Sequence, residues 1–263
     1  MSLSTGTGPL TGSPAGAFNF DLAAASPAHR IYFAADERRI RALVSDVTVL
    51  DTSRARLLYE TGIGPRVYAP LEDYAQELLT PTDTTSHCPF KGDASYWTIA
   101  AAGEVREDAL WAYRNPLPEA SWLEGLAALY PNKVDAWVVE EDRVFAHLRD
   151  PFHRVDVHES SRPVVVRING REIASTQRPT LVFETGLPVR AYISRLDIEP
   201  GAVSAGSGKR TVCPYKGQAD YWTVAGLTDA AWSYEAPLPE AVRAQGLLSF
   251  DTAVDGVEVA IGQ

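Results

Sequence analysis

The five residues Cys88-Pro89-Phe90-Lys91-Gly92 return later in the chain as Cys213-Pro214-Tyr215-Lys216-Gly217. The motifs around the two copies also match in order: Leu57-Leu58-Tyr59-Glu60-Thr61-Gly62 with Leu181-Val182-Phe183-Glu184-Thr185-Gly186, Tyr96-Trp97-Thr98 with Tyr221-Trp222-Thr223, Trp111-Ala112-Tyr113 with Trp232-Ser233-Tyr234, and Pro116-Leu117-Pro118-Glu119 with Pro237-Leu238-Pro239-Glu240. The offset is 124 residues for the two glutamates, 125 for the cysteines and 121 between Trp111 and Trp232. So constant an offset indicates duplication of one unit of about 100 residues.

The residue patterns of both copies predict strands. Apolar or β-branched runs at 56–60 and 180–184 end at Thr-Gly, as strands do before turns. Asn169-Gly170 follows the run 164–168, which predicts a hairpin with a type I′ turn. Residues 96–100 and 221–225 also have strand character.

One short helix per copy is predicted, from 118 to about 129 and from 239 to about 248. Proline suits the first turn of a helix, and Leu123, Leu126 and Ala127 would form an apolar face. The predicted fold class is therefore all-β, with one short helix per repeat.

Composition divides the chain into four segments. Residues 1–28 are rich in small and polar side chains and lack both the basic start and the apolar stretch of a secretory signal, so we expect a flexible N-terminal tail. Residues 29–142 form the first repeat and residues 163–263 the second. Residues 143–162 between them are predicted to be a polar connector.

Charge and hydropathy restrict the partners. The formal net charge is −10, which repels phosphate backbones, so we expect no nucleic-acid binding. No apolar run approaches the roughly 18 residues of a membrane-spanning helix. We expect a cytoplasmic protein with no membrane partner, and the sequence leaves its oligomeric state open.

The sequence predicts no metal and no other cofactor. Two cysteines, Cys88 and Cys213, are too few for a disulfide framework or a tetrathiolate zinc site, and we expect reduced thiols. His147, His153 and His158 in the connector follow no metal-ligand spacing and are typical of a polar linker.

Taken together, the motifs resemble the bacterial and fungal family known as domain of unknown function 427, sometimes labelled a nucleotidyltransferase domain. The resemblance rests on Glu184-Thr185-Gly186-Leu187-Pro188, the two Cys-Pro-aromatic-Lys-Gly boxes, the Tyr-Trp pairs, the Trp-x-Tyr and Pro-Leu-Pro-Glu segments, and the joint from Arg149 to Asp156. It implies two tandem β-tent domains, in each of which two β-sheets lean together over a pocket.

Three features of the sequence limit what this resemblance implies. Relatives of the β-tent fold hold zinc through two Cys-x-x-Cys pairs, which are absent here, so the resemblance implies no zinc site. The nucleotidyltransferase label finds neither a phosphate-binding loop nor paired aspartates in this sequence. In the first copy, Gly62-Ile63-Gly64-Pro65 replaces the tighter Gly-Leu-Pro, and His87 precedes the cysteine. Either difference allows the copies to differ in role.

Four residues are candidates for chemistry: Cys88 and Glu60 in the first copy, and Cys213 and Glu184 in the second. Each thiol is interpreted either as a nucleophile or as a small buried group ahead of a turn, and we favour the structural interpretation. His87 is adjacent to Cys88, and neighbouring strand residues point to opposite faces, so no Cys–His dyad is expected. Each glutamate is interpreted as a general base, as an acceptor for a ligand or as the partner of a nearby arginine, and we expect the arginine pairing.

Aromatic and cationic residues form the candidate ligand-binding set. Lys91 and Lys216 either bind an anionic ligand or pair with Glu60 and Glu184. Alternation along each strand sends one ring of a Tyr-Trp pair inward and the other to the opposite face. The predicted ligand-binding residues are Arg66, Tyr68, Lys91, Tyr96, Trp97 and Trp111, and their counterparts Arg190, Tyr192, Lys216, Tyr221, Trp222 and Trp232.

Three hypotheses about function follow. The leading one is a small-molecule-binding protein with an aromatic and charged pocket in each repeat. The second is an enzyme acting on a small metabolite, with one of the cysteines or glutamates as the reactive group. In the third, the repeats are non-catalytic interaction modules.

Overall fold

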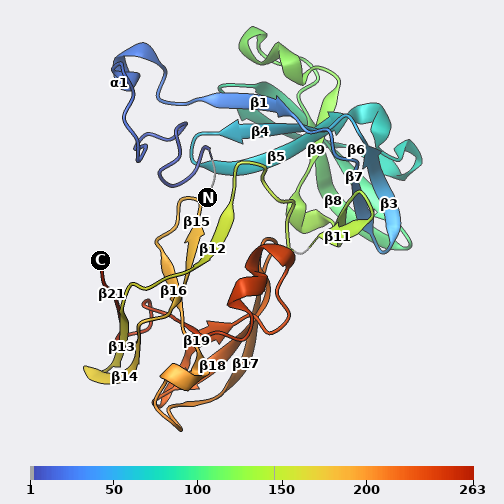
Figure 1. Ribbon diagram of the computed structural model, residues 1–263. Helices are drawn as coiled ribbons and strands as arrows, with labels where there is room; N and C mark the ends of the chain where they lie inside the picture. Colours follow the sequence, from blue (N-terminus) through green and yellow to red (C-terminus); the bar gives the residue numbers. More distant parts are fainter. Residues whose placement is uncertain (1–2, 145) are drawn as a thin grey trace. The chain divides into compact units, whose positions relative to one another are not determined.

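The computed structural model describes residues 3–144 and 146–263. The chain divides into two compact units, Met1–Asp150 and Pro151–Gln263. Antiparallel β-strands make up most of each unit, and only short helical turns interrupt them (Figure 1). The all-β prediction and the division into two domains are confirmed.

The first unit contains two sheets. The larger has the order β1-β4-β5-β9-β8-β7-β6 and the smaller β11-β10-β2-β3. The strands are β1 Ile31–Ala35, β2 Ile40–Val44, β3 Val47–Thr52, β4 Arg56–Glu60, β5 Ile63–Pro70, β6 Leu79–Cys88, β7 Gly92–Ala101, β8 Glu104–Ala112, β9 Leu126–Leu129, β10 Ala136–Val139 and β11 Asp142–Val144. The short helices are α1 Leu22–Ala25, η1 Leu71–Asp73, η2 Gln76–Leu78, η3 Pro118–Leu123 and η4 Pro131–Lys133.

The second unit repeats this plan with three smaller sheets, ordered β12-β15-β16, β14-β13-β21 and β17-β18-β19-β20. Its strands are β12 Val155–Glu159, β13 Val164–Ile168, β14 Arg171–Thr176, β15 Thr180–Glu184, β16 Arg190–Tyr192, β17 Val203–Cys213, β18 Gly217–Val224, β19 Leu227–Ser233, β20 Ser249–Phe250 and β21 Val257–Ile261, with the turns η5 Arg195–Asp197 and η6 Pro239–Ala244. Two backbone hydrogen bonds between Ile193 and Leu248 link β16 to β20, where β5 and β9 pair continuously in the first unit.

The predicted hairpin is confirmed. Ile168 pairs with Arg171, so the connection has two residues, and Asn169 and Gly170 both have positive φ (51° and 77°). These angles are what a type I′ turn requires.

The predicted helices over 118–129 and 239–248 are wrong in type and length. Only η3 and η6 form, as short 3-10 turns, and β9 and β20 follow them. Gly125 and Gly246, with φ of +74° and +67°, end the turns in the left-handed region. The backbone groups of β9 then pair with β5 and β8, so hydrogen bonding to the sheet replaces the continuation of a helix.

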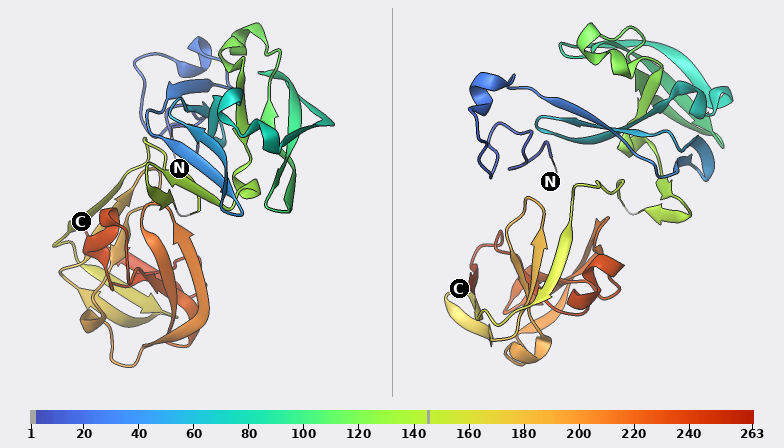
Figure 2. Two further views of the ribbon diagram at one scale, coloured as in Figure 1. Left: turned by 90° about the vertical axis from the view of Figure 1, so that its right-hand side faces the viewer. Right: turned by 45° about the horizontal axis from the view of Figure 1, so that its top comes forward.

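The larger sheet of the first unit has a core on each face. On one face, Trp97, Leu110 and Leu129 pack against the smaller sheet, which contributes Ile40 and Trp137. On the other face, Leu58, Tyr68, Tyr96 and Trp111 form a second cluster, which Ala120 and Leu123 of η3 join. Figure 2 shows η3, in green, on one side of this sheet. The second unit has the same two clusters, with Ala244 of η6 in the place of η3.

Candidate functional site

A buried charged triad lies at the end of β4. Lys91 Nζ donates a hydrogen bond to Glu60 Oε2 at 2.5 Å, and His29 Nε2 lies 2.9 Å from Glu60 Oε1. Because an ionised carboxylate can only accept, the Nε2 nitrogen of His29 carries the hydrogen. The Glu60 and Lys91 side chains are 7% and 8% exposed, and the His29 ring stacks on Phe90 with centroids 3.8 Å apart.

The second unit contains the same triad. His153 Nε2 lies 3.0 Å from Glu184 Oε1, and Lys216 donates to Glu184 Oε2. Burial raises the pKa of Glu184, but the hydrogen bond from His153 and the charge of Lys216 lower it more, to about 2. A carboxylate that is fully ionised and held at both oxygens is a weak general base. The geometry therefore gives Glu184 the role of orienting the lysine and the histidine.

The turn of the Cys-Pro-aromatic-Lys-Gly box positions the lysine. Lys91 N donates to Cys88 O at 3.2 Å, and Leu117 N donates to Lys91 O at 3.0 Å. Gly92 has φ +102°, and a Cβ there would lie 3.4 Å from Asn115 O and Leu117 N. Glycine is required because the backbone is left-handed and another backbone segment lies against it.

Several predicted residues gather beside the triad. Trp111 Nε1 donates to Tyr68 Oη at 3.2 Å, and Trp232 Nε1 donates to Tyr192 Oη at 3.0 Å. Burial raises the pKa of the Tyr68 phenol above its usual range, and the nearby Glu60 carboxylate adds to this shift. Tyr96 and Cys88 belong to the same cluster, as do Tyr221 and Cys213 in the second unit.

The predicted alternation of the Tyr-Trp pairs is confirmed. Trp97 packs in the core on the opposite face from Tyr96, with the Arg114 guanidinium 5.3 Å from its ring. Trp222 packs in the corresponding core of the second unit, 4.1 Å from the guanidinium of Arg195. Neither tryptophan lies with the other predicted ligand-binding residues of its unit.

His87 faces solvent, as alternation predicts. Its Nδ1 lies 2.7 Å from Asp93 Oδ1, and both side chains are well exposed. Cys88 packs instead against the aromatic cluster. Neighbouring strand positions thus separate the imidazole of His87 from the thiol.

The predicted arginine partners of the glutamates are wrong. Glu60 pairs with His29 and Lys91, and Glu184 with His153 and Lys216. Arg190 instead lies 5.5 Å from the Trp232 ring.

Arg66 has a different position in the first unit. Its Nη1 contacts the carbonyl oxygens of Gly64 and Pro65 at 3.3 and 3.4 Å. Within residues 3–144 and 146–263 no carboxylate forms an ion pair with the Arg66 guanidinium.

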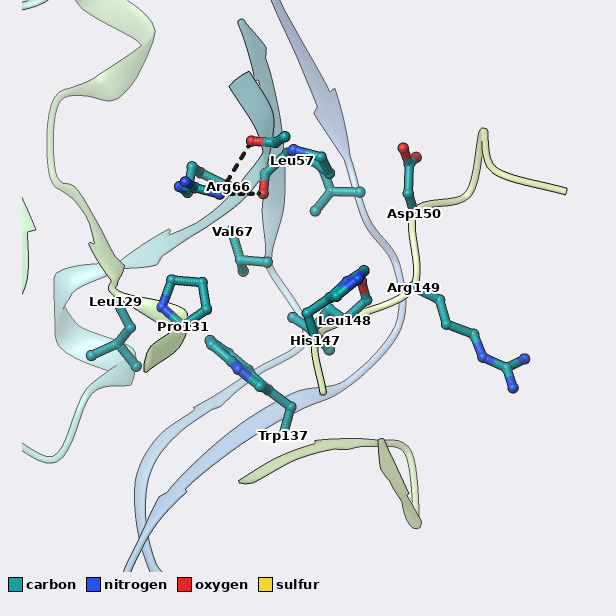
Figure 3. A pocket seen from close by; sticks show the side chains of 12 residues that line it. Leu57, Arg66, Val67, Leu129, Pro131, Trp137, His147, Leu148, Arg149 and Asp150 are labelled. Carbon is teal, nitrogen blue, oxygen red and sulfur yellow. Dashed lines mark hydrogen bonds between the residues drawn. The ribbon is translucent and has the colours of Figure 1, made fainter. Parts of the chain in front are cut away.

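A pocket of about 300 Å³ lies beside β4 and β5 of the first unit (Figure 3). Leu57 and Val67 line it, on the sheet face opposite Leu58 and Tyr68 of the aromatic cluster. Its apolar wall consists of Leu57, Val67, Leu129, Pro131, Trp137 and Leu148, and Gly64, Pro65, Arg66, His147, Arg149 and Asp150 complete it. In Figure 3, Trp137 and Arg66 lie at opposite ends, and the Arg149 side chain extends away. The pocket is thus formed between the two sheets of the first unit.

Trp137 contributes a buried polar atom to the wall of this pocket. Trp137 is 4% exposed, and its Nε1 makes no hydrogen bond with any described residue. A buried N–H without an acceptor costs about 1–3 kcal/mol. The pocket wall therefore contains a hydrogen-bond donor that an acceptor on a bound molecule would satisfy.

The prediction from sequence missed three residues of these sites. His29 lies in the segment next to the predicted tail, although His29-Arg30 matches His153-Arg154 at the same offset of 124 residues. Extending the repeat by one motif would have found it. Trp137 gave no signal, because the second copy has Val259 at its position: Trp137 on β10 pairs with Ala42, and Val259 on β21 pairs with Val166. Leu57 gave none because it stands among other apolar residues of a strand.

No group of three or more His, Cys, Asp or Glu side chains in residues 3–144 and 146–263 is arranged to hold a metal ion. Among the helices of these same residues, none has the length and apolar character needed to cross a bilayer.

Comparison with known proteins gives one result. The model of the family described as domain of unknown function 427 matches residues 33–140 and, a second time, residues 156–260. No curated protein matches the chain. Each match covers most of one structural unit, in agreement with the duplication.

Proposed function

This chain belongs, through both of its units, to the domain-of-unknown-function 427 family, and we propose that it is a small-molecule-binding protein. The pocket of Figure 3 is the observation that carries the proposal. Ligand sites are concave, mainly apolar and about 300–1,000 Å³ in volume, with a few polar groups that fix orientation. The pocket between β4, β5, β9 and β10 has this composition.

The two units then differ in role. Both keep the His–Glu–Lys triad, in which the glutamate holds the lysine and histidine in place. The apolar pocket is a property of the first unit, because Trp137 and the Gly64-Pro65 turn belong to that copy alone. We therefore assign ligand binding to the first unit and a structural role to the triads.

The test is equilibrium dialysis of the full-length protein against 6-ethylnaphthalene-2-carboxylate, a two-ring probe that fits the volume. We expect binding of one probe per chain. Val67→Phe fills the pocket and should weaken binding at least tenfold. Val105→Phe makes the same change at an exposed position of the same unit and should leave binding unchanged. Absence of binding to the wild type, or equal binding to the Val67→Phe variant, contradicts the proposal.

A further inference from the structure

Trp137 gives the pocket of the first unit a hydrogen-bond donor. Its indole lines the pocket wall and is 4% exposed, and its Nε1 has no acceptor within residues 3–144 and 146–263. The indole nitrogens of Trp111 and Trp232 each donate to a tyrosine hydroxyl. Because buried indole N–H groups usually find such a partner, the structure favours an acceptor from a bound molecule at Trp137.

The basic residues of the pocket wall do not direct a cation into it. Arg66 pairs with Leu58 of β4, so its side chain lies on the sheet face of the aromatic cluster, opposite Val67. The Arg149 side chain extends away from the pocket in Figure 3. His147 is exposed, and its Nδ1 donates to a backbone carbonyl at 2.8 Å. These three residues therefore give no reason to expect an anionic ligand.

A carboxylate of the protein also belongs to the wall. Asp150 is 6% exposed and accepts a hydrogen bond from Tyr59 Oη at 2.9 Å. An anionic ligand would bring a second negative charge into the same apolar pocket, where like charges repel more strongly than in water. An ammonium group can only donate, so it would leave the N–H of Trp137 without an acceptor. Both considerations favour an uncharged ligand.

The volume and the walls of the pocket set the size of the ligand. A cavity of about 150 Å³ holds benzene, and this pocket has a volume of about 300 Å³. Its walls combine the flat indole of Trp137 and the ring of Pro131 with leucine and valine side chains. These surfaces favour a flat body of about two rings.

From these observations, and resting on the proposed function, we infer that the ligand is an uncharged two-ring compound with a carbonyl oxygen that accepts the hydrogen bond of Trp137 Nε1. No covalent bond is made or broken in this binding. The apolar body of the ligand fills the space between the two sheets, and the carbonyl fixes its orientation.

Three probes of nearly the same planar shape test the inference by equilibrium dialysis against the full-length protein. They are 2-acetylnaphthalene, 2-isopropenylnaphthalene, in which a methylene group replaces the carbonyl oxygen, and 2-naphthoate, which carries a negative charge. We expect the ketone to bind roughly tenfold more tightly than the hydrocarbon, because the hydrocarbon leaves the buried N–H unpaired. We expect a similar preference for the ketone over the naphthoate, because burying an unpaired charge is costly.

Two variants locate the donor. Trp137→Phe should abolish the preference for the ketone over the hydrocarbon, since both probes then meet a ring without an N–H group. Trp111→Phe is the matched control, because it removes a buried indole N–H from the aromatic cluster on the other face of the larger sheet, and the preference should persist. Comparing two probes within one variant cancels the effect of the substitution on pocket volume. Urea unfolding confirms that each variant is folded.

The outcomes separate this inference from the proposed function. Equal affinity for the ketone and the hydrocarbon, a ketone preference that survives Trp137→Phe, or naphthoate binding as tight as that of the ketone would overturn the inference. The proposed function would still stand if Val67→Phe weakened binding of the probes. Failure of all three probes and of 6-ethylnaphthalene-2-carboxylate to bind would overturn both.

Discussion

Lys91 donates a hydrogen bond to Glu60 although the two side chains are 8% and 7% exposed and lie 31 residues apart. Removing charges from water is costly, so a buried ion pair adds little net stability, but breaking one partner leaves an unpaired charge. The pair therefore matters most for fixing the box against the end of β4. Its recurrence as Glu184 and Lys216 shows that the duplicated unit kept this constraint.

Breaking the pair on one side should destabilise the first unit. We expect Lys91→Met to lower its free energy of unfolding by about 3–5 kcal/mol, because Glu60 stays buried without its main partner. The double variant Glu60→Met/Lys91→Met should cost less than Lys91→Met alone. Urea unfolding measures both, and Lys133→Met, at a partly exposed lysine without an ion pair in the described chain, is the control. A double variant less stable than Lys91→Met would contradict this interpretation.

Acid should destabilise the second unit through Glu184. Its pKa is about 2 in the folded chain against an ordinary value of 4.5. A lowered carboxyl pKa stabilises the fold above about pH 4.5, and this contribution, roughly 3 kcal/mol, is lost as the pH falls from 4.5 through 2. Urea unfolding between pH 6 and pH 2.5 should show wild type approaching Glu184→Gln in stability. An unchanged gap between them, with exposed Glu258→Gln as control, would disprove the assignment.

Alanine at the last position of either box should distort the turn. Gly217 has φ +100°, and a Cβ there would lie 3.3 Å from Leu238 N. A Cβ on Gly92 would likewise lie 3.4 Å from Leu117 N. We expect Gly92→Ala and Gly217→Ala each to cost roughly 1–3 kcal/mol. Gly64→Ala, where no atom lies within 4 Å and φ is not positive, should change stability by less than about 0.5 kcal/mol. Equal melting temperatures for all three variants would rule out strain as the reason for glycine.

Truncation of Trp97 should lower the stability of the first unit and leave binding of the probe unchanged. Trp97 packs in the core between the sheets and does not line the pocket. Trp97→Ala should lower the free energy of unfolding by about 3–5 kcal/mol. At a low temperature at which the variant remains folded, it should still bind 6-ethylnaphthalene-2-carboxylate. Loss of that binding with full stability would place Trp97 in the binding site.

The thiol of Cys88 should be dispensable for binding. Cys88 packs against the aromatic cluster on the face opposite the pocket. We expect Cys88→Ser to bind 6-ethylnaphthalene-2-carboxylate within twofold of wild type by equilibrium dialysis. A large loss of affinity would move the site to the triad face and favour the enzymatic hypothesis.

The sequence by itself determined the duplication, the strands β4 and β15, and the hairpin at Asn169-Gly170. These features depend on local chemistry, namely alternation, positive φ at a turn and a repeated spacing. The short lengths of η3 and η6 did not follow from the sequence. The hydrogen bonds that replace a longer helix after η3 come from strands distant in the chain.

Tertiary structure alone decided which charges meet and where the pocket lies. From the sequence, the partner of Glu60 was either a lysine or an arginine, and the packing of the box turn against β4 selected Lys91. Val67 and Trp137 are 70 residues apart and line one pocket only because β5 and β10 belong to two sheets that pack face to face. Contacts between separate sheets have no short-range sequence signature, so only the folded chain shows them.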